Sequence, residues 1–378
     1  MPSVIIIGPA HPLRGGLASF DERLAREWQT NGWNTEIWTF SLQYPGILFP
    51  GKTQFSEEPA PKDISIKVCI NSVNPLNWIK IGNRLKNLKP DLIIVRYWLP
   101  FMGPGLGTIL RFAKSNEHTK VICIADNVIP HEKRPGDTVF TKYFLKSADA
   151  FITMSEKVNQ DLRLFENKKP SKVVDHPLYD NFGEKIDKSK ARIHLGIPVD
   201  EKLVLFFGFI RKYKGLNLLL DAFANPLLRN SGIKCLVAGE FYEDEKPYLE
   251  QIEKAGIEKQ ILMHTHFISD SDVKYYLSAA DVVVQPYIQA TQSGVTPLAY
   301  HFEQPMVVTN VGALPRLVPH GKVGYVCEPN PESIADTILK FFEGNPERFL
   351  AELIEEKKKL SWSKLIEEIK IYYHDLAK

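Results

Sequence analysis

Two cations stand in a segment that leads from a run of apolar residues into a predicted helix. Arg211 and Lys214 lie in the stretch Phe206–Gly215, directly before the helical pattern Leu216–Ala224. A loop at the carboxyl end of a buried strand, followed by a helix, presents backbone amides and cations to an anion. Two basic residues in a loop are also typical of a solvated turn. Their position at the strand end favours phosphate binding, and Arg211 and Lys214 are the candidate ligands.

Glycines follow two other apolar runs in equivalent places. Gly15 and Gly16 come after the run Val4–Ile7 and before a predicted helix, where an exposed backbone can approach a phosphate. A second loop of this kind contains Thr291, Gln292, Ser293, Gly294 and Val295. Both features have plain alternatives. The glycine pair also suits an ordinary loop, and Ser293 or Thr291 suits a helix N-cap worth about 1 kcal/mol without any ligand.

Acid–base chemistry is suggested by the segment Ala125–Glu132, at the end of the predicted strand Val121–Ala125. It contains Asp126, Asn127 and His131. A carboxylate can stabilise positive charge, and a histidine titrates near neutral pH and can accept a proton from a substrate hydroxyl. Alternatively, Asp126 and Asn127 cap a turn and His131 is a surface residue. The position at the carboxyl end of a strand favours a catalytic role.

Two spacings that resemble metal sites have simpler explanations. Asp270 and Asp272 precede a helical pattern, where an acidic residue is a good N-cap. His264 and His266 alternate along a strand, but no third ligand is placed with them. We therefore expect no metal and no bound cofactor.

Elements that would position these residues alternate regularly along the chain. The first half has apolar strand-length runs at Val4–Ile7, Thr35–Phe40, Leu92–Arg96, Val121–Ala125 and Ala150–Met154. The pattern restarts with Leu203–Phe207, Lys234–Ala238, Ile261–His264, Val282–Gln285 and Met306–Thr309. Strands buried on both faces and separated by helices form parallel sheets. The sequence thus predicts two doubly wound, Rossmann-like α/β domains facing a central cleft, residues 1–185 and 186–360, with ligands beyond the carboxyl ends of the strands.

Composition agrees with a globular chain of this size. The 378 residues include 44% hydrophobic and 24% charged residues, and the net charge of +2 does not favour a nucleic-acid partner. Residues 1–185 hold 24 Lys and Arg against 19 Asp and Glu. This excess suits a solvated basic face, or contact of the N-terminal domain with the inner face of a membrane. Four widely spaced cysteines and the lack of a basic leader favour a cytoplasmic protein with reduced thiols.

The order of these motifs resembles family 4 (group 1) glycosyltransferases, which have the GT-B fold. The resemblance covers nearly the whole chain and is strongest from Phe206 to Val326. It runs through the Gly15-Gly16 loop, Gly208…Arg211…Lys214, Ala238-Gly239-Glu240, Thr291–Val295 and Pro305–Gly312. It implies a retaining, metal-independent enzyme that binds a UDP- or GDP-sugar in the C-terminal domain. The acceptor, a glycan or a lipid-linked molecule, would lie in the N-terminal domain, onto which the final helix 361–378 would pack.

Individual roles also follow from the resemblance. Arg211 and Lys214 would contact the diphosphate near Gly208 and Glu240. Gly294 and Val295 would donate backbone amides to the diphosphate, and Gly15-Gly16 would close over it. The backbone at Phe267 and Ile268 would face the base.

Five family positions differ in this chain. The family often has a histidine where Asp126 stands, and commonly a glutamate where Arg316 stands. The family's two glutamates are replaced by Thr291 and Ala299, and the arginine that follows the strand glycine is replaced by Phe209. The leading hypothesis is a glycosyltransferase of polysaccharide or glycoconjugate synthesis. The alternatives are an epimerase of the same fold and a nucleotide-sugar-binding protein without catalytic activity.

Overall fold

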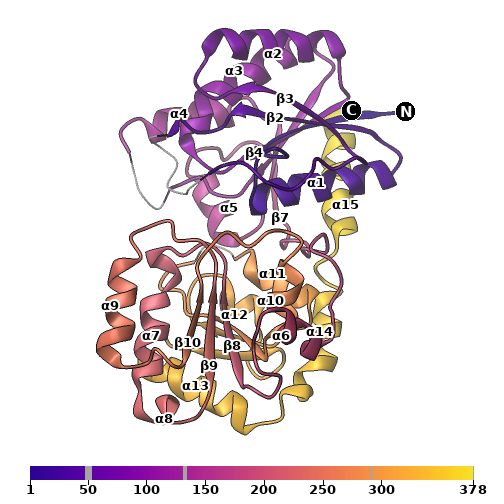
Figure 1. Cartoon of the computed structure of the whole chain (residues 1–378). Helices are drawn as coiled ribbons and strands as arrows, with labels where there is room; N and C mark the ends of the chain where they lie inside the picture. The colour runs from indigo at the N-terminus through magenta and orange to yellow at the C-terminus, as the bar shows by residue number, and fades with distance from the viewer. Residues whose placement is uncertain (47–52, 131–133, 291–292, 378) are drawn as a thin grey trace. The chain divides into compact units, whose positions relative to one another are not determined.

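The computed structural model describes residues 1–46, 53–130, 134–290 and 293–377. The chain divides into two compact units (Figure 1). Unit 1 comprises Met1–His176 and Trp362–Lys378, and unit 2 comprises Pro177–Ser361. The division thus falls after His176 rather than after residue 185. No helix within the described ranges is both long enough and apolar enough to cross a membrane.

Unit 1 is built on a seven-stranded parallel sheet in the order β3-β2-β1-β4-β5-β6-β7. Its strands are β1 (Ser3–Ile7), β2 (Asn34–Leu42), β3 (Ser65–Asn71), β4 (Leu92–Tyr97), β5 (Lys120–Ala125), β6 (Ala150–Thr153) and β7 (Ser171–Val173). The five predicted strands are all present, with ends displaced by no more than two residues. The strand order reverses at β1, which lies between β2 and β4. Ligands of doubly wound sheets bind beside such a reversal.

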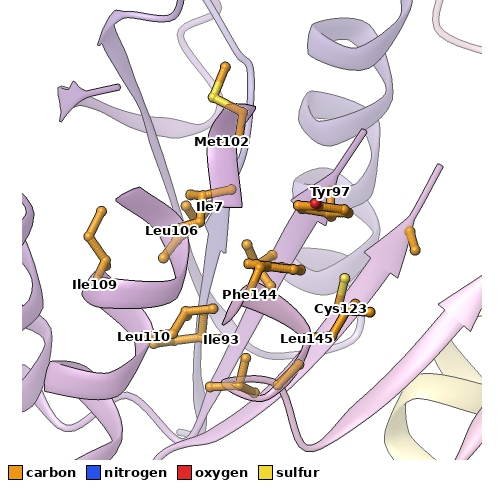
Figure 2. Packing of buried hydrophobic residues seen from close by; sticks show 14 of the residues in the cluster. Ile7, Ile93, Tyr97, Met102, Leu106, Ile109, Leu110, Cys123, Phe144 and Leu145 are labelled. Atoms are coloured by element: carbon orange, nitrogen blue, oxygen red, sulfur yellow. The ribbon is translucent and has the colours of Figure 1, made fainter. Parts of the chain in front are cut away.

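Helices cover both faces of this sheet. Those of unit 1 are α1 (Gly16–Thr30), α2 (Pro75–Leu88), α3 (Gly103–Lys114), α4 (Asp137–Leu145), α5 (Glu156–Arg163) and α15 (Trp362–Ala377), with a 3-10 turn η2 (Pro100–Met102). Figure 2 shows how α3 and α4 pack on one face, where Leu106, Leu110 and Phe144 lie against Ile7 and Ile93. These buried apolar contacts form the core that holds the strand ends in place.

The opposite face is covered by α1 and α15, which are far apart in sequence. The rings of Phe20 and Trp362 are 4.8 Å apart, and those of Trp33 and Tyr373 are 5.3 Å apart. Ile366 and Ile369 are also buried. The amphipathic pattern of the last helix therefore buries its apolar stripe within unit 1.

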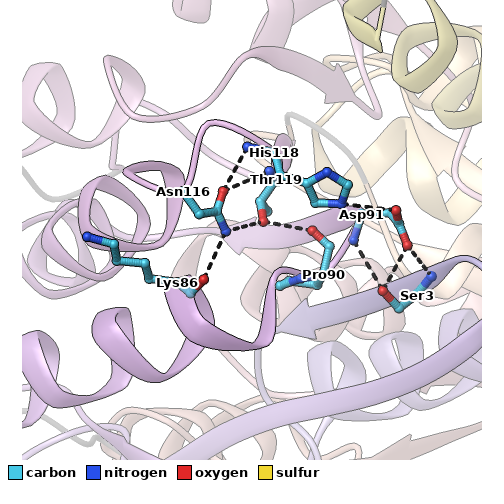
Figure 3. A network of polar contacts seen from close by, with 7 residues as sticks. All are labelled: Ser3, Lys86, Pro90, Asp91, Asn116, His118 and Thr119. Atoms are coloured by element: carbon cyan, nitrogen blue, oxygen red, sulfur yellow. Dashed lines mark hydrogen bonds and ion pairs between the residues drawn. The ribbon is translucent and has the colours of Figure 1, made fainter.

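A polar network closes the amino-terminal edge of the sheet (Figure 3). The backbone N–H and the hydroxyl of Ser3 both donate to Asp91 Oδ2, and His118 Nε2 lies 3.1 Å from Oδ1. Burial opposes ionisation of Asp91, but the hydrogen bonds from Ser3 and His118 outweigh it and lower the pKa of its carboxyl group. This network joins the starts of β1, β4 and β5, and the opposite, carboxyl-terminal edge carries the candidate residues of this unit.

Unit 2 contains a six-stranded parallel sheet in the order β10-β9-β8-β11-β12-β13. The strands are β8 (Leu203–Phe207), β9 (Lys234–Ala238), β10 (Ile261–His264), β11 (Val282–Gln285), β12 (Met306–Thr309) and β13 (Gly324–Cys327). Its main helices are α6 (Lys188–His194), α7 (Leu216–Ala224), α8 (Pro226–Arg229), α9 (Lys246–Ala255), α10 (Val273–Ala279), α11 (Val295–His301), α12 (Leu314–Leu317), α13 (Pro331–Glu343) and α14 (Leu350–Lys357). Two 3-10 turns, η3 (Lys212–Lys214) and η4 (Pro346–Phe349), complete it. The predicted fold class, two doubly wound parallel α/β units, is confirmed.

Candidate functional site

The candidate site of unit 2 lies where the strand order reverses at β8, between β9 and β11. The loops that follow β8 and β11 touch each other there. Gly215 has φ +70°, and a Cβ on it would stand 1.9 Å from the Pro286 carbonyl oxygen. The Ile288 N–H donates to the Tyr213 carbonyl oxygen at 2.8 Å. Only glycine permits this approach, which holds the β8 loop against the β11 loop.

Lys214 is the central cation of this arrangement. Its Nζ lies 3.0 Å from the place where a Cβ would stand on Gly208, and Val295 borders the same place. The Tyr287 ring centroid is 5.9 Å from Nζ. Among the described residues, no carboxylate forms an ion pair with this ammonium. Burial, reinforced by repulsion from Arg211, lowers the pKa of Lys214 to about 7. A half-buried cation without a counter-ion in this part of the chain is suited to an incoming anion.

Arg211 belongs to an aromatic part of the site. Its guanidinium lies 5.0 Å from the centroid of the Tyr242 ring. The Phe209 ring is 4.3 Å from that of Tyr242 and 6.2 Å from that of Phe267. We call Phe209, Tyr242 and Phe267 the aromatic shelf. The three residues follow β8, β9 and β10, so the parallel sheet brings together aromatic groups that are distant in sequence. Sequence analysis does not predict this grouping and names only Phe267 of the three among the candidates.

In the loop before α11, several polar groups form hydrogen bonds with other groups of unit 2. Ser293 Oγ accepts the Val295 N–H at 3.1 Å and donates to Gln285 Oε1 at 2.7 Å. The Thr296 hydroxyl donates to the same oxygen. Ser293 lies one residue before the N-cap position, which is Gly294, and the Val295 amide already has an acceptor. Gly294 packs against the Tyr179 ring. Thr291 and Gln292 lie outside the described residues.

The remaining candidates of unit 2 line the same edge of the sheet. Gly239 has φ +144° and approaches the Gly208 carbonyl oxygen so closely that a Cβ would stand 2.3 Å from it. Glu240 is buried, and its carbonyl oxygen accepts the Ile210 N–H at 2.8 Å. Ile268, the residue that follows Phe267, is buried. The structure thus brings Gly208, Arg211, Lys214, Glu240, Phe267, Ile268, Ser293, Gly294 and Val295 to one edge of unit 2.

Asp126 lies in unit 1 within a buried ionic cluster. Arg96 Nε donates to Asp126 Oδ2 at 3.0 Å, and Nη2 donates to Oδ1. Asp21 Oδ1 lies 3.6 Å from Arg96 Nε, and the guanidinium stands over the Phe20 ring. The exposed fractions are 1% for Arg96 and 8% for Asp126. Arg96 is therefore a core residue whose charge is compensated internally.

The buried surroundings of this cluster disfavour the simultaneous ionisation of Asp21 and Asp126. Burial raises the pKa of Asp21 well above its ordinary value, and attraction by Arg96 offsets this only in part. Burial also raises the pKa of Asp126, again against attraction by Arg96. Gly8 is required beside them, since a Cβ there would stand 2.1 Å from Asp21 Oδ2. Asp126 thus holds Arg96 at the carboxyl end of the sheet, whether or not it also contacts a substrate.

The other candidates of unit 1 border the first helix and the end of β5. Gly15 has φ +102° and caps α1 by accepting the Ala18 N–H at 2.9 Å, and the exposed Gly16 begins that helix. The buried Oδ1 of Asn127 has no hydrogen-bond donor among the described residues. His131 lies outside the described residues. The catalytic roles of Asp126, Asn127 and His131 remain predictions.

No cluster with three His, Cys, Asp or Glu side chains placed to hold a metal occurs in the described part of the chain. Asp272 instead accepts a hydrogen bond from Ser269 at 2.7 Å, directly before α10. His264 Nδ1 lies 3.0 Å from the Tyr276 hydroxyl oxygen. These contacts are local and structural.

Removal of the Asp126 carboxylate should destabilise unit 1. Asp126→Ala removes the carboxylate that accepts two hydrogen bonds from the buried Arg96, and we expect a loss of about 3–5 kcal/mol in the free energy of unfolding. Asp126→Asn keeps an acceptor oxygen and should lose less. The control is Asp63→Ala, which breaks the surface pair with Arg26 and should cost about 0–1 kcal/mol. Equal losses for Asp126→Ala and Asp63→Ala in denaturant unfolding would contradict the structural role.

The buried amine of Lys214 should make stability depend on pH in a defined window. Its folded-state pKa of about 7 lies below the value of an unfolded lysine, so the unfolded chain binds more protons between these values. This residue's contribution to stability therefore rises with pH above about 7. Lys214→Met should raise the unfolding midpoint most at pH 6 to 7, with the difference shrinking toward about pH 10. Thermal unfolding of both proteins across this range, with a difference that is constant in pH, would refute the assignment.

Residues 187–360 match the family model of the glycosyl transferases group 1. An uncharacterized glycosyltransferase of Methanocaldococcus jannaschii is 31% identical over 151 residues, which cover 39% of this chain and 38% of that protein. The chain spans about half the length of the curated relatives it matches.

Solved structures resemble the chain over its whole length. Sucrose-phosphate synthase from Thermosynechococcus elongatus superposes with a TM-score of 0.76 at 16% identity, covering 100% of this chain and 99% of that chain. HepE of Anabaena in complex with UDP gives a TM-score of 0.74 at 15% identity, with coverages of 99% and 100%. At these identities the likeness establishes the fold. The likeness shows that this chain has the GT-B fold, and its residues 187–360 are similar to the group 1 glycosyltransferases.

Proposed function

We propose that this chain is a retaining glycosyltransferase that moves a sugar from a nucleoside-diphosphate sugar to a glycan or a lipid-linked acceptor. The observation that carries the proposal is the position of Lys214, whose ammonium lies over Gly208 beside Val295 at the reversal of strand order. A diphosphate supplies the negative charge that this cation does not receive from a described carboxylate. Arg211 stands three residues earlier in the same loop and adds a second positive charge.

The leaving group explains why fixed cations suit this reaction. Transfer releases a nucleoside diphosphate, so negative charge develops on the phosphate oxygen as the bond to the sugar breaks. Preorganised cations stabilise this charge more in the transition state than in the bound substrate. Lys214 and Arg211 would perform this role without a metal ion.

The aromatic shelf supports a nucleotide rather than a simple phosphate. Phe209, Tyr242 and Phe267 lie along the β8, β9 and β10 edge, next to Arg211. Aromatic faces stack on nucleobases with little dependence on the base. HepE, which shares the fold, binds UDP. We propose UDP- or GDP-sugars as donors, in a cytoplasmic pathway of polysaccharide or glycoconjugate synthesis.

For unit 1 we propose the acceptor side of the reaction. Gly15 is the N-cap and Gly16 the first residue of α1, which follows β1, and Asp126 and Asn127 stand at the end of β5. Direct action of Asp126 on the sugar requires its carboxylate to serve both Arg96 and the substrate. We therefore assign Asp126 first to the positioning of Arg96 and propose the sugar contact as its second role.

An epimerase, or a nucleotide-sugar-binding protein without transferase activity, is the second candidate. Ala299 stands where the family has a glutamate, and it is fully buried within α11. No carboxylate at this position can contact a ribose. Incubation of UDP-glucose and GDP-mannose with and without oligosaccharide acceptors separates the possibilities. Acceptor-dependent release of nucleotide supports transfer, acceptor-independent isomerisation supports the epimerase, and binding without turnover supports the inactive relative.

The donor site predicts a specific loss of affinity. Lys214→Ala removes a charge-assisted hydrogen bond to the diphosphate and should weaken UDP or GDP binding by about 1.5–3 kcal/mol. Lys212→Ala is the matched control, because Lys212 is exposed and lies two residues away in the same loop. Calorimetric titration of each folded variant measures the difference. Equal affinities of Lys214→Ala and the wild type would exclude Lys214 from the donor site.

Turnover should not require a divalent metal. The proposed cations are side chains, so exhaustive chelation with EDTA should leave the rate within about twofold of its starting value. The measurement is acceptor-dependent nucleotide release before chelation, after chelation and after addition of Mg²⁺ or Mn²⁺. Activity that disappears with EDTA and returns with metal would show that the diphosphate needs a cation beyond Lys214 and Arg211.

A further inference from the structure

The loops that follow β8 and β9 stay paired beyond the ends of the two strands. Ile210 and Phe241 form an isolated parallel bridge. The Ile210 N–H donates to the Glu240 carbonyl oxygen at 2.8 Å, and the Ile210 carbonyl oxygen accepts the Tyr242 N–H at 3.0 Å. This pairing brings Tyr242, a member of the aromatic shelf, to the point where the chain leaves the sheet and enters the turn η3.

The side chain of Glu243, in the loop after β9, joins this loop to the turn. Its Oε2 accepts the Lys212 N–H at 2.9 Å, and its Oε1 accepts the hydroxyl of Tyr248 on α9. Lys212 is the first residue of η3, and the first N–H groups of a helical turn have no acceptor within the turn. The carboxylate therefore supplies an acceptor that the turn with Arg211 and Lys214 lacks.

Tyr248 orients the Glu243 carboxylate. Tyr248 is buried, and its ring centroid lies 5.4 Å from that of Phe241. Burial and the adjacent Glu243 carboxylate raise the pKa of Tyr248, so the phenol keeps its proton and remains a donor. Within the described ranges no ion pair joins Glu243 to Arg211 or Lys214. The exposed Glu243 thus holds the turn through a backbone amide and leaves the charge of both cations to a ligand.

Two parts of the proposed donor site meet at this carboxylate. The cations Arg211 and Lys214 belong to the turn, whereas Tyr242 of the aromatic shelf directly precedes Glu243 in the loop after β9. The far end of the turn is held separately, because Gly215 contacts the loop after β11. A ligand that binds the cations and the shelf together gains from a fixed separation between them, since no binding free energy is then used to order the turn.

We propose that Glu243 is a positioning residue, which sets the separation between the cations of the turn and the aromatic shelf and so favours ligands that carry both a nucleoside and a diphosphate. The inference rests on the proposed function, because it takes the turn and the shelf as the binding sites for the two halves of the donor. Glu243 acts through the Lys212 amide and needs no contact with the donor. Inorganic pyrophosphate, which has no nucleoside, contacts the turn alone and gains nothing from the fixed separation.

Calorimetric titration of the full chain with UDP, GDP and inorganic pyrophosphate tests the proposal. Glu243→Ala should raise the Kd of the preferred nucleoside diphosphate about tenfold, because the turn can then move relative to the shelf. The Kd of pyrophosphate should change by no more than about twofold. Glu243→Gln keeps an acceptor for the Lys212 N–H and should restore the nucleotide affinity to within about threefold of the wild type.

Two further variants separate the hydrogen bonds of Glu243 from its charge. Glu245→Ala removes an exposed carboxylate from the same loop whose side chain forms no hydrogen bond in the described part of the chain, and it should bind as the wild type does. Tyr248→Phe removes the hydroxyl that orients Glu243 and should raise the Kd of the nucleotide about threefold. Combined with Glu243→Ala, it should cause no further loss, because the two residues act on the turn through one carboxylate.

Three results would overturn the inference while the proposed function stands. The first is equal nucleotide affinity of Glu243→Ala and the wild type. The second is a parallel loss of nucleotide and pyrophosphate affinity, which would make Glu243 a structural cap of the turn. The third is tighter nucleotide binding by Glu243→Gln than by the wild type, which would mean that the carboxylate acts through its charge. A wild-type protein that binds neither UDP nor GDP would instead overturn the proposed function, and this inference with it.

Discussion

The close contact between the loops after β8 and β11 determines the geometry of the candidate donor site. Gly215 passes so near the Pro286 carbonyl oxygen that no side chain can be accommodated, and the Tyr213 carbonyl accepts the Ile288 amide. This contact fixes the short turn that contains Lys214. Its ammonium is consequently held over Gly208, partly removed from water, instead of extending into solvent as a loop lysine usually does. The cost of desolvating this charge is the reason that an anion should be bound tightly there.

In the buried cluster of unit 1, acidic groups outnumber basic ones. The cluster has one guanidinium, Arg96, and two carboxylates, Asp21 and Asp126. Burial raises the pKa of both carboxyl groups, so the cluster favours retention of a proton over two full negative charges. Arg96 also stands over the Phe20 ring, which packs on Trp362 of the last helix. The C-terminal helix is thereby connected to the end of β4 and β5 through a chain of direct contacts.

The departures from the family pattern have structural consequences at two positions. Phe209 replaces a charged residue and joins Tyr242 and Phe267, so an aromatic surface stands where an arginine is usual. The guanidinium of Arg211, two residues after Phe209, lies over the ring of Tyr242. Ala299 is buried in α11, where a carboxylate would be costly without a partner. At the proposed donor site, binding would therefore depend on stacking and on fewer charges, and a ribose contact would have to come from a residue other than Ala299.

The sequence by itself determined the alternation of strands and helices, because strands buried on both faces leave uninterrupted apolar runs. All ten predicted strands occur, and α7 has the predicted limits. It did not reveal β3, β7 and β13, which lie at sheet edges and are half-exposed or only three or four residues long. Such strands bury one face or little surface, so their residues carry no continuous apolar signal.

Local sequence also located Arg211, Lys214 and Ser293, because each belongs to a loop beside a recognisable strand or helix. Only the tertiary structure decided how these residues act. It buried Arg96 between Asp21 and Asp126, bonded the Ser293 hydroxyl to Gln285 and Val295, and joined Phe209 to Tyr242 and Phe267. The members of one group are separated by up to 105 residues in the sequence, as Asp21 and Asp126 are. Spacing along the chain carries no information about such contacts, because the order of parallel strands in the sheet differs from their order in sequence.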